Sequence, residues 1–103
     1  MMLAILKIEM VFPGSNSLKE KRRMVKSVLS RVRQKYPVAI AEVGDLEIRN
    51  RALIGVVCIS TEERHGHSVL DKTLNYMESV APDAEISPNS EKYFGSNPTI
   101  CHC

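Results

Sequence analysis

The chain has 103 residues, of which 44% are hydrophobic and 25% charged, and its formal net charge is +2. This length and composition predict one globular domain with a single hydrophobic core. No apolar run approaches the roughly 20 residues of a membrane-spanning helix, and the N-terminal stretch lacks the basic start and small-residue cleavage site of a secretory signal. Three cysteines do not make a disulfide framework. We therefore expect a cytoplasmic protein that does not enter a membrane.

The first predicted element is a strand over Leu3–Phe12, because apolar side chains alternate along it. A turn rich in proline, glycine and polar residues then leads into a helix over Ser17–Tyr36. Ser17 and Glu20 have the spacing of a capping box, and Pro37 ends the helix because the residue before a proline avoids the α conformation. The apolar stripe of this helix comprises Leu18, Val25, Val28, Leu29, Val32 and Tyr36.

The second half of the chain repeats the alternation of strands and a helix. A short strand over Val38–Val43 and an almost unbroken apolar strand over Ala52–Ile59 are separated by a polar turn. Thr61 is expected to cap a second helix that ends before Pro82, and Ala84–Ser87 is the last predicted strand. The core stripe of that helix comprises Val69, Thr73, Tyr76, Met77 and Val80.

The order of these elements predicts a ferredoxin-like α/β sandwich with βαββαβ connectivity. We expect a four-stranded antiparallel or mixed sheet with two helices on one face. The predicted domain covers residues 1–88, and residues 89–103 form a polar C-terminal tail.

One face of the sheet stays open in this architecture. The third strand offers two sets of side chains, of which only one can face the helices: Leu53, Val57 and Ile59, or Ile54, Val56 and Cys58. The other set leaves an apolar patch on the open face, and such patches usually mark an interface. We predict homo-oligomerisation through this face, with coverage by the C-terminal tail as the alternative.

Several motifs occur in the same order as in a known family. They are PGSNSLKEKR at residues 13–22, VKS at 25–27, AEVG at 41–44, Arg51-Ala52 and VLDK at 69–72. Over roughly residues 2–87 the chain thereby resembles the YlxP-like family of small uncharacterised bacterial proteins. The resemblance implies a ferredoxin-like fold and no catalytic residue. Because members are often encoded beside translation-initiation and ribosome-assembly genes, it also implies a role near the ribosome.

The first helix is strongly basic. Eight of the chain's 14 basic residues lie at positions 17–36, against the single acid Glu20. On a helical wheel five of them form a continuous flank beside the apolar stripe, in the order Arg22, Arg33, Lys26, Lys19 and Arg23. The other three spread over the opposite flank: Lys21, Lys35 and Arg31.

The continuous flank suits the phosphates of folded RNA, which it would bind by charge rather than by reading bases. We therefore predict its five residues as a nucleic-acid-binding site, with ribosomal RNA or the ribosome as the partner. The alternative is an ordinary solvated helix face whose long side-chain stems cover the edge of the core.

The sheet is a less suitable platform for RNA. RNA-recognition motifs share this topology and stack bases on aromatic residues of their two central strands. The strand Ala52–Ile59 has no aromatic residue, and Leu3–Phe12 has only Phe12 at its end. We expect any RNA contact to use the helix.

Candidate metal ligands occur in two places, as His65 and His67 and as the terminal Cys101, His102 and Cys103. Structural zinc sites take four ligands with paired spacing, which neither group provides. We predict no metal site and no cofactor, and we expect both histidines to lie exposed at the start of the second helix.

Two further residues have predicted structural roles. Glu42 shares a strand face with Val38 and Ile40, so it is expected to turn inward, where a carboxylate needs a partner. Arg51 or a basic residue of the first helix is the predicted partner, in a structural ion pair. Cys58 is predicted to be a buried free cysteine rather than a nucleophile, because no histidine or basic residue stands beside it.

These features predict a binding protein rather than an enzyme. The favoured hypothesis is an RNA- or ribosome-associated accessory factor that uses the basic helix. The alternative is an oligomeric small-ligand-binding or regulatory module, for which the same scaffold is common.

Overall fold

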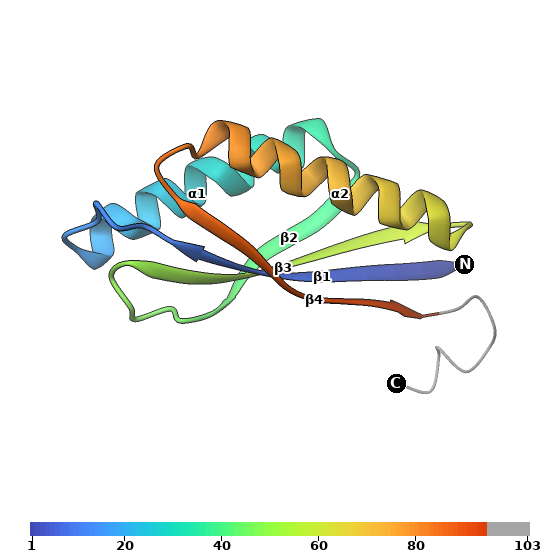
Figure 1. The fold of residues 1–103 in the computed structure, drawn as a ribbon, viewed down its shortest axis with the longest axis horizontal. Helices are drawn as coiled ribbons and strands as arrows, with labels where there is room; N and C mark the ends of the chain where they lie inside the picture. Colours follow the sequence, from blue (N-terminus) through green and yellow to red (C-terminus); the bar gives the residue numbers. More distant parts are fainter. Residues whose placement is uncertain (95–103) are drawn as a thin grey trace.

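The computed structural model describes the backbone of residues 1–94 and the side chains of residues 1–89. Its elements are β1 (Met2–Val11), α1 (Leu18–Lys35), β2 (Val38–Gly44), β3 (Arg51–Ser60), α2 (Glu63–Val80) and β4 (Glu85–Phe94). The strands form one sheet in the order β2-β3-β1-β4, and every neighbouring pair is antiparallel. Figure 1 shows α1 and α2 on the same face of this sheet. The predicted ferredoxin-like architecture is confirmed, and its sheet is antiparallel rather than mixed.

Alternation along the two central strands decides which side chains enter the core. In β3 the set Ile54, Val56 and Cys58 faces the helices, with at most 1% of each residue exposed. The register pairs Ile54 with Ile8 and Val56 with Leu6 of β1, so apolar side chains of both strands form a continuous floor under the helices. The odd-numbered set of β3 therefore lies on the open face.

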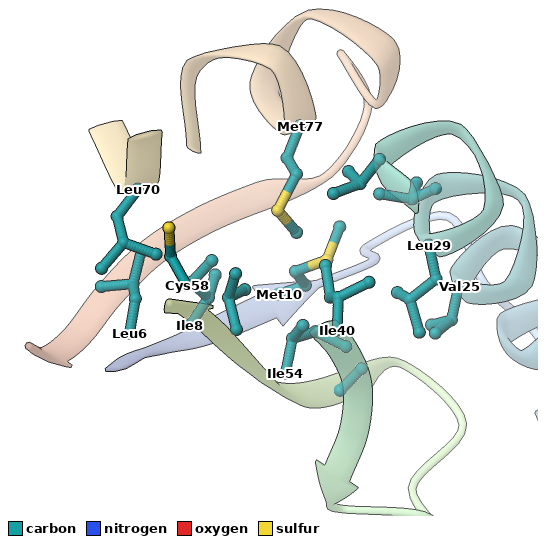
Figure 2. Close-up of a cluster of buried hydrophobic side chains, with 14 of the residues drawn as sticks. Leu6, Ile8, Met10, Val25, Leu29, Ile40, Ile54, Cys58, Leu70 and Met77 are labelled. Carbon is teal, nitrogen blue, oxygen red and sulfur yellow. The ribbon is translucent and has the colours of Figure 1, made fainter. Parts of the chain in front are cut away.

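Both helices contribute to the layer above this floor. Figure 2 shows the labelled side chains of the cluster meeting between the sheet and the helices: Leu6, Ile8, Met10, Val25, Leu29, Ile40, Ile54, Cys58, Leu70 and Met77. Each fully buried aliphatic side chain contributes about 1.5–3 kcal/mol relative to exposure. No buried side-chain nitrogen or oxygen among the described residues lacks a hydrogen-bond partner. Neither of the two described helices is long and apolar enough to cross a membrane.

The predicted capping of α1 is confirmed with one difference. Ser17 is the N-cap, and its Oγ accepts a hydrogen bond from the Glu20 N–H at 3.1 Å. The Glu20 carboxylate accepts from the N–H of Asn16, at 3.2 Å, rather than from that of Ser17. Tyr36 has extended backbone angles ahead of Pro37, so the helix ends where the proline predicts.

Two predicted boundaries were wrong. The N-cap of α2 is Glu62, not Thr61, because β3 continues to Ser60 and the Ser60 hydroxyl accepts from the Glu62 N–H at 3.1 Å. The last strand continues to Phe94 beside β1, well past the predicted end at Ser87. The boundary predicted after residue 88 consequently falls inside β4.

Gly66 sets how closely α2 approaches the sheet. It is buried, and a Cβ atom at this position would lie 3.0 Å from the Cβ of Ala4 on β1. Its backbone φ is not positive, so the requirement for glycine comes from space rather than from conformation.

Replacing Gly66 with valine should therefore force α2 away from β1. We expect a loss of about 1–3 kcal/mol in the free energy of unfolding, measured by urea titration, as overpacked cores show. Gly14 is the control, because no atom lies within 4 Å of a Cβ added there. Gly14→Ala should change stability by less than about 0.5 kcal/mol. Equal effects of the two substitutions would contradict the role given to Gly66.

Candidate nucleic-acid interface

The five residues of the predicted binding flank all lie on the exposed surface of α1. The helix is amphipathic and buries Val25, Val28, Leu29 and Val32. It packs over β2, an edge strand, and its other side meets α2. We call the exposed set Lys19, Arg22, Arg23, Lys26 and Arg33 the basic flank.

Two members of the basic flank have partners within the protein. Arg33 donates a hydrogen bond from Nη2 to the main-chain carbonyl of Ile40 on β2, at 2.7 Å. Arg22 lies 3.7 Å from the carboxylate of Glu47, and both side chains are more than half exposed. An ion pair this exposed is weak, so Arg22 can exchange this partner for another anion, whereas Arg33 also covers the edge strand.

The other three members have no such partner. The side chains of Lys19, Arg23 and Lys26 form no ion pair and no hydrogen bond with any residue that the structure describes. Lys19 and Arg23 line a shallow hollow of about 340 Å³ near the start of α1, together with Ser17 and Glu20. Glu20 is already bonded to the Asn16 N–H. The charges of Lys19, Arg23 and Lys26 therefore face solvent without a carboxylate partner among the described residues.

The opposite side of α1 differs from the prediction. Lys35 is placed over the ring of Tyr76 on α2, with its Nζ 4.5 Å from the ring centroid. Tyr76 also meets Tyr36 edge to face, with centroids 5.6 Å apart. A cation over an aromatic face is attracted by the ring. This cluster holds the end of α1 against α2, while Arg31 stays exposed.

The prediction that Lys21 lies on the flank with Lys35 and Arg31 was wrong. The side chain of Lys21 is completely buried, with the ammonium 2.8 Å from a carboxylate oxygen of Glu42. The same ammonium is within hydrogen-bond distance of three main-chain carbonyls, those of Asp45 at 2.9 Å, Arg51 at 3.3 Å and Leu46 at 3.4 Å. A lysine has three N–H donors and no acceptor, so this set of oxygens satisfies it fully.

A sequence signal for this burial was present. Lys21 follows Leu18 by three residues and precedes Val25 by four, so it occupies a position of the apolar stripe itself. Its charge led to its assignment to the surface. A charged residue in a core stripe needs a buried partner of opposite charge, and Glu42 was already predicted to turn inward. The two observations together make Lys21 a candidate for burial near Glu42, but local periodicity does not say which residues meet through space.

The inward orientation and ion pair predicted for Glu42 are confirmed, and the partner comes from the helix. Arg51 instead directs its side chain to Asp45, with Nε 3.1 Å from Oδ2. Asp45 has a positive φ of 57°, a conformation that aspartate tolerates better than most residues. The Lys21 ammonium and the Arg51–Asp45 pair both stabilise the conformation of the β2–β3 loop. The Ser15 hydroxyl also contacts this loop, because it donates a hydrogen bond to the Arg49 carbonyl at 2.7 Å.

The candidate metal ligands and the candidate nucleophile that the structure describes lie outside α1 and its basic flank. His65 and His67 are exposed near the start of α2, as predicted, and His67 pairs with Asp71 at 3.3 Å. No group of three or more potential metal ligands occurs among the described residues, and Cys101, His102 and Cys103 lie outside them. Cys58 is buried and free, as predicted, and burial raises the pKa of its thiol. A thiol in that state is a poor nucleophile.

The open face of the sheet contains a broad apolar hollow of about 510 Å³. Its floor is made by small residues of β2 and β3, with Ala39, Ala41 and Gly55 among them. Lys7 is the one charged residue in its described lining.

Comparisons with known proteins agree over nearly the whole chain. The model of the family described as a protein of unknown function (DUF503) matches residues 3–89. The uncharacterized protein YlxP of Bacillus subtilis (strain 168) is 28% identical over 93 residues, which cover 90% of this chain and 100% of that protein.

Among solved structures, the chain is similar to two designed proteins. One is the de novo designed protein LFR1 1 with a ferredoxin fold, with a TM-score of 0.61, 14% identity and coverage of 86% of this chain and 84% of that one. The other is the de novo designed protein Foldit4, with a TM-score of 0.51, 10% identity and coverage of 94% and 100%. Likeness at such low identity shows the fold alone.

Removing the buried ammonium should destabilise the protein strongly. Lys21→Met keeps a long apolar stem but leaves Glu42 unpaired and three carbonyls without their donor. We expect a loss of about 3–5 kcal/mol in the free energy of unfolding by urea titration, as for other broken buried pairs. Arg22→Met is the control at the neighbouring position and should cost less than about 1 kcal/mol, because its pair is exposed.

The double variant Lys21→Met/Glu42→Gln measures the interaction energy between the two side chains, apart from their contacts with other groups. It removes the orphaned carboxylate charge, so it should be more stable than the sum of the two single effects by about 0.5–3 kcal/mol. Strict additivity would contradict a direct energetic coupling between Lys21 and Glu42.

Proposed function

Because the chain belongs to the DUF503 family of proteins of unknown function, its activity is to be derived from its own residues, and we propose that it is a cytoplasmic RNA-binding accessory factor of the ribosome. It binds by the basic flank of α1 and performs no covalent chemistry. The gene neighbourhood implied by the family resemblance supports the ribosome as the partner.

The observation that carries this proposal is the set of three cations without a partner. Lys19, Arg23 and Lys26 are exposed on one side of a helix whose only acid, Glu20, is bonded to the main chain. The net charge of the whole chain is only +2, so this concentration of charge is local. An RNA backbone supplies phosphates to such a row and releases its counterions on binding.

The fold favours phosphate contacts over base reading. None of β1, β2 and β3 contains an aromatic residue, so the centre of the sheet offers no ring on which a base could stack. The basic flank lies along the β2 edge, on the side of α1 away from α2. We therefore expect recognition of RNA shape with little sequence preference.

The alternative function, a small-ligand or regulatory module, would use the hollow of the open face. That hollow has an apolar floor and a single described charge, Lys7. Specific ligand sites usually combine an apolar wall with several convergent polar groups. The arrangement therefore favours an apolar partner surface there over a polar small ligand.

The RNA proposal predicts a strong dependence of binding on salt. If three to five members of the basic flank meet phosphates, the logarithm of the affinity for ribosomal subunits should fall against the logarithm of salt concentration with a slope of roughly −2 to −4. Replacing Lys19, Arg23 and Lys26 together with glutamine should flatten the slope by roughly 2 and weaken binding. Co-sedimentation across a salt series measures both quantities.

The matched control removes the same charge elsewhere. Arg31, Arg64 and Lys72 are exposed basic residues outside the flank, and their triple glutamine variant should keep most of the affinity. Glutamine is a good helix former, so both variants should retain the wild-type circular dichroism spectrum. Equal losses of affinity in the two variants would show that binding depends on the net charge of the protein rather than on the basic flank. A wild-type protein without salt-dependent binding to ribosomal subunits or structured RNA would refute the proposal.

A further inference from the structure

The sheet face opposite the helices is largely apolar. Its residues on β1 and β3 include Leu3, Ile5, Val11, Leu53, Val57 and Ile59, all at least partly exposed. Two apolar side chains are strongly exposed on this side, Ile59 at 67% and Val43 on β2 at 57%. Continuous apolar patches of this kind are uncommon on monomers and mark interaction sites.

Two opposite charges lie at the centre of this patch. Lys7 and Glu9 are two residues apart on β1, so both point to the open face. Across the described part of the chain neither forms an ion pair. The centre of the patch thus carries one positive and one negative charge, about 6.8 Å apart along a central strand. Arg51 and Glu85 lie at the edge of the same face, on either side of Val11.

We propose that two copies of this chain form an isologous dimer through the open face, with Lys7 of each copy opposite Glu9 of the other. This arrangement follows from a two-fold axis that lies between the two sheets, runs perpendicular to the strands and passes over Ile8 of β1. Rotation about this axis reverses the strand direction of the second copy, so residue 7 of one copy lies opposite residue 9 of the other. An isologous interface needs such self-complementarity, in which residue i meets residue j in both directions. The two side chains are long enough to meet across the roughly 10 Å between packed sheets.

The same axis also matches shape. In the β1–β3 register Lys7 pairs with Gly55 and Glu9 pairs with Leu53. The axis therefore places Leu53 of one copy over Gly55 of the other, beside the small residues that floor the open-face hollow. Val43 borders the hollow at Gly55, since its Cγ1 is 3.2 Å from the position of a Cβ atom there, so the partner's Leu53 would enter the hollow beside Val43, twice by symmetry. These contacts lie close to the axis, so the twist between packed sheets displaces them little.

The available area is sufficient for a specific dimer. Strands about 4.8 Å apart with a rise of about 3.3 Å per residue give a four-stranded face of roughly 600 Å² per copy. The total of about 1,200 Å² is the lower end of stable protein interfaces. At that size, a single charge at the centre should be enough to separate the copies.

The dimer does not depend on the RNA proposal. The basic flank is on α1, which covers the other face of the sheet, so both flanks stay exposed in the dimer (Figure 1). Failure of RNA binding would leave the dimer intact, and a monomeric protein could still bind RNA.

The first test places a charge in the apolar part of the face. Wild-type protein should sediment as a dimer, and Val57→Asp should raise the dissociation constant at least about tenfold. Val57 lies on the open face, so the aspartate is solvated in the monomer and the fold should persist. Asn75→Asp, an exposed position on α2, adds the same charge away from the sheet and should remain dimeric.

The second test exchanges the two central charges. Lys7→Glu and Glu9→Lys each place like charges opposite one another, so each variant alone should dissociate at least about tenfold more readily. The double variant Lys7→Glu/Glu9→Lys restores complementarity and should dimerise again. A mixture of the two single variants should form a heterodimer, because one copy then presents two acids and the other two bases.

Each outcome decides the proposal. Recovery in the double variant and in the mixture establishes both the face and the orientation. A wild-type protein that is monomeric at its highest soluble concentration, whatever else covers the face, overturns it. So do single charge variants that dimerise as the wild type does, or a mixture without heterodimers.

Discussion

The buried contact between Lys21 and Glu42 is the constraint on which the rest of the structure depends. An ammonium is costly to remove from water, and this one is compensated by a carboxylate 2.8 Å away, by two carbonyls of the β2–β3 connection and by the carbonyl of Arg51 at the start of β3. The contact joins the first turns of α1 to the far end of β2. It fixes both the rotation of α1 about its axis and the shape of the loop that follows β2.

That rotation sorts the basic residues of α1 by role. With Lys21 directed into the core, the opposite sides of the helix are no longer equivalent. Lys35 meets the ring of Tyr76 on α2, whereas Lys19, Arg23 and Lys26 turn outward on the side of the β2 edge. Of the eight basic residues of this helix, Lys19, Arg23 and Lys26 thus form one exposed row, while Arg31 is exposed apart from that row. The burial of Lys21 in the core thus determines which basic residues of α1 form the candidate interface with RNA.

The two candidate interaction surfaces are on opposite faces of one sheet and have different chemistry. The helix face presents exposed cations of the kind that bind phosphates. The open face presents branched apolar side chains around Lys7 and Glu9, which suits a desolvated partner of matching shape. Occupying one surface leaves the other accessible. A dimer would carry two basic flanks directed away from each other, and two such sites on one particle raise its affinity for an extended polyanion.

The sequence by itself determined the order of elements, the N-cap and the end of α1 and the exposure of the basic flank, because these follow from local periodicity and capping chemistry. It predicted the core-facing stripes of the two helices only in part, since Lys21 of α1 and Leu70 of α2 are fully buried but were not assigned to them. It also predicted that Glu42 turns inward. Only the tertiary structure decided which basic residue meets it, since Lys21 and Glu42 are 21 positions apart and pair through space. The face of β3 that enters the core, the engagement of Arg33 with Ile40 and the extension of β4 to Phe94 were likewise decided by neighbours across the fold. Local patterns contain no information on such long-range partners.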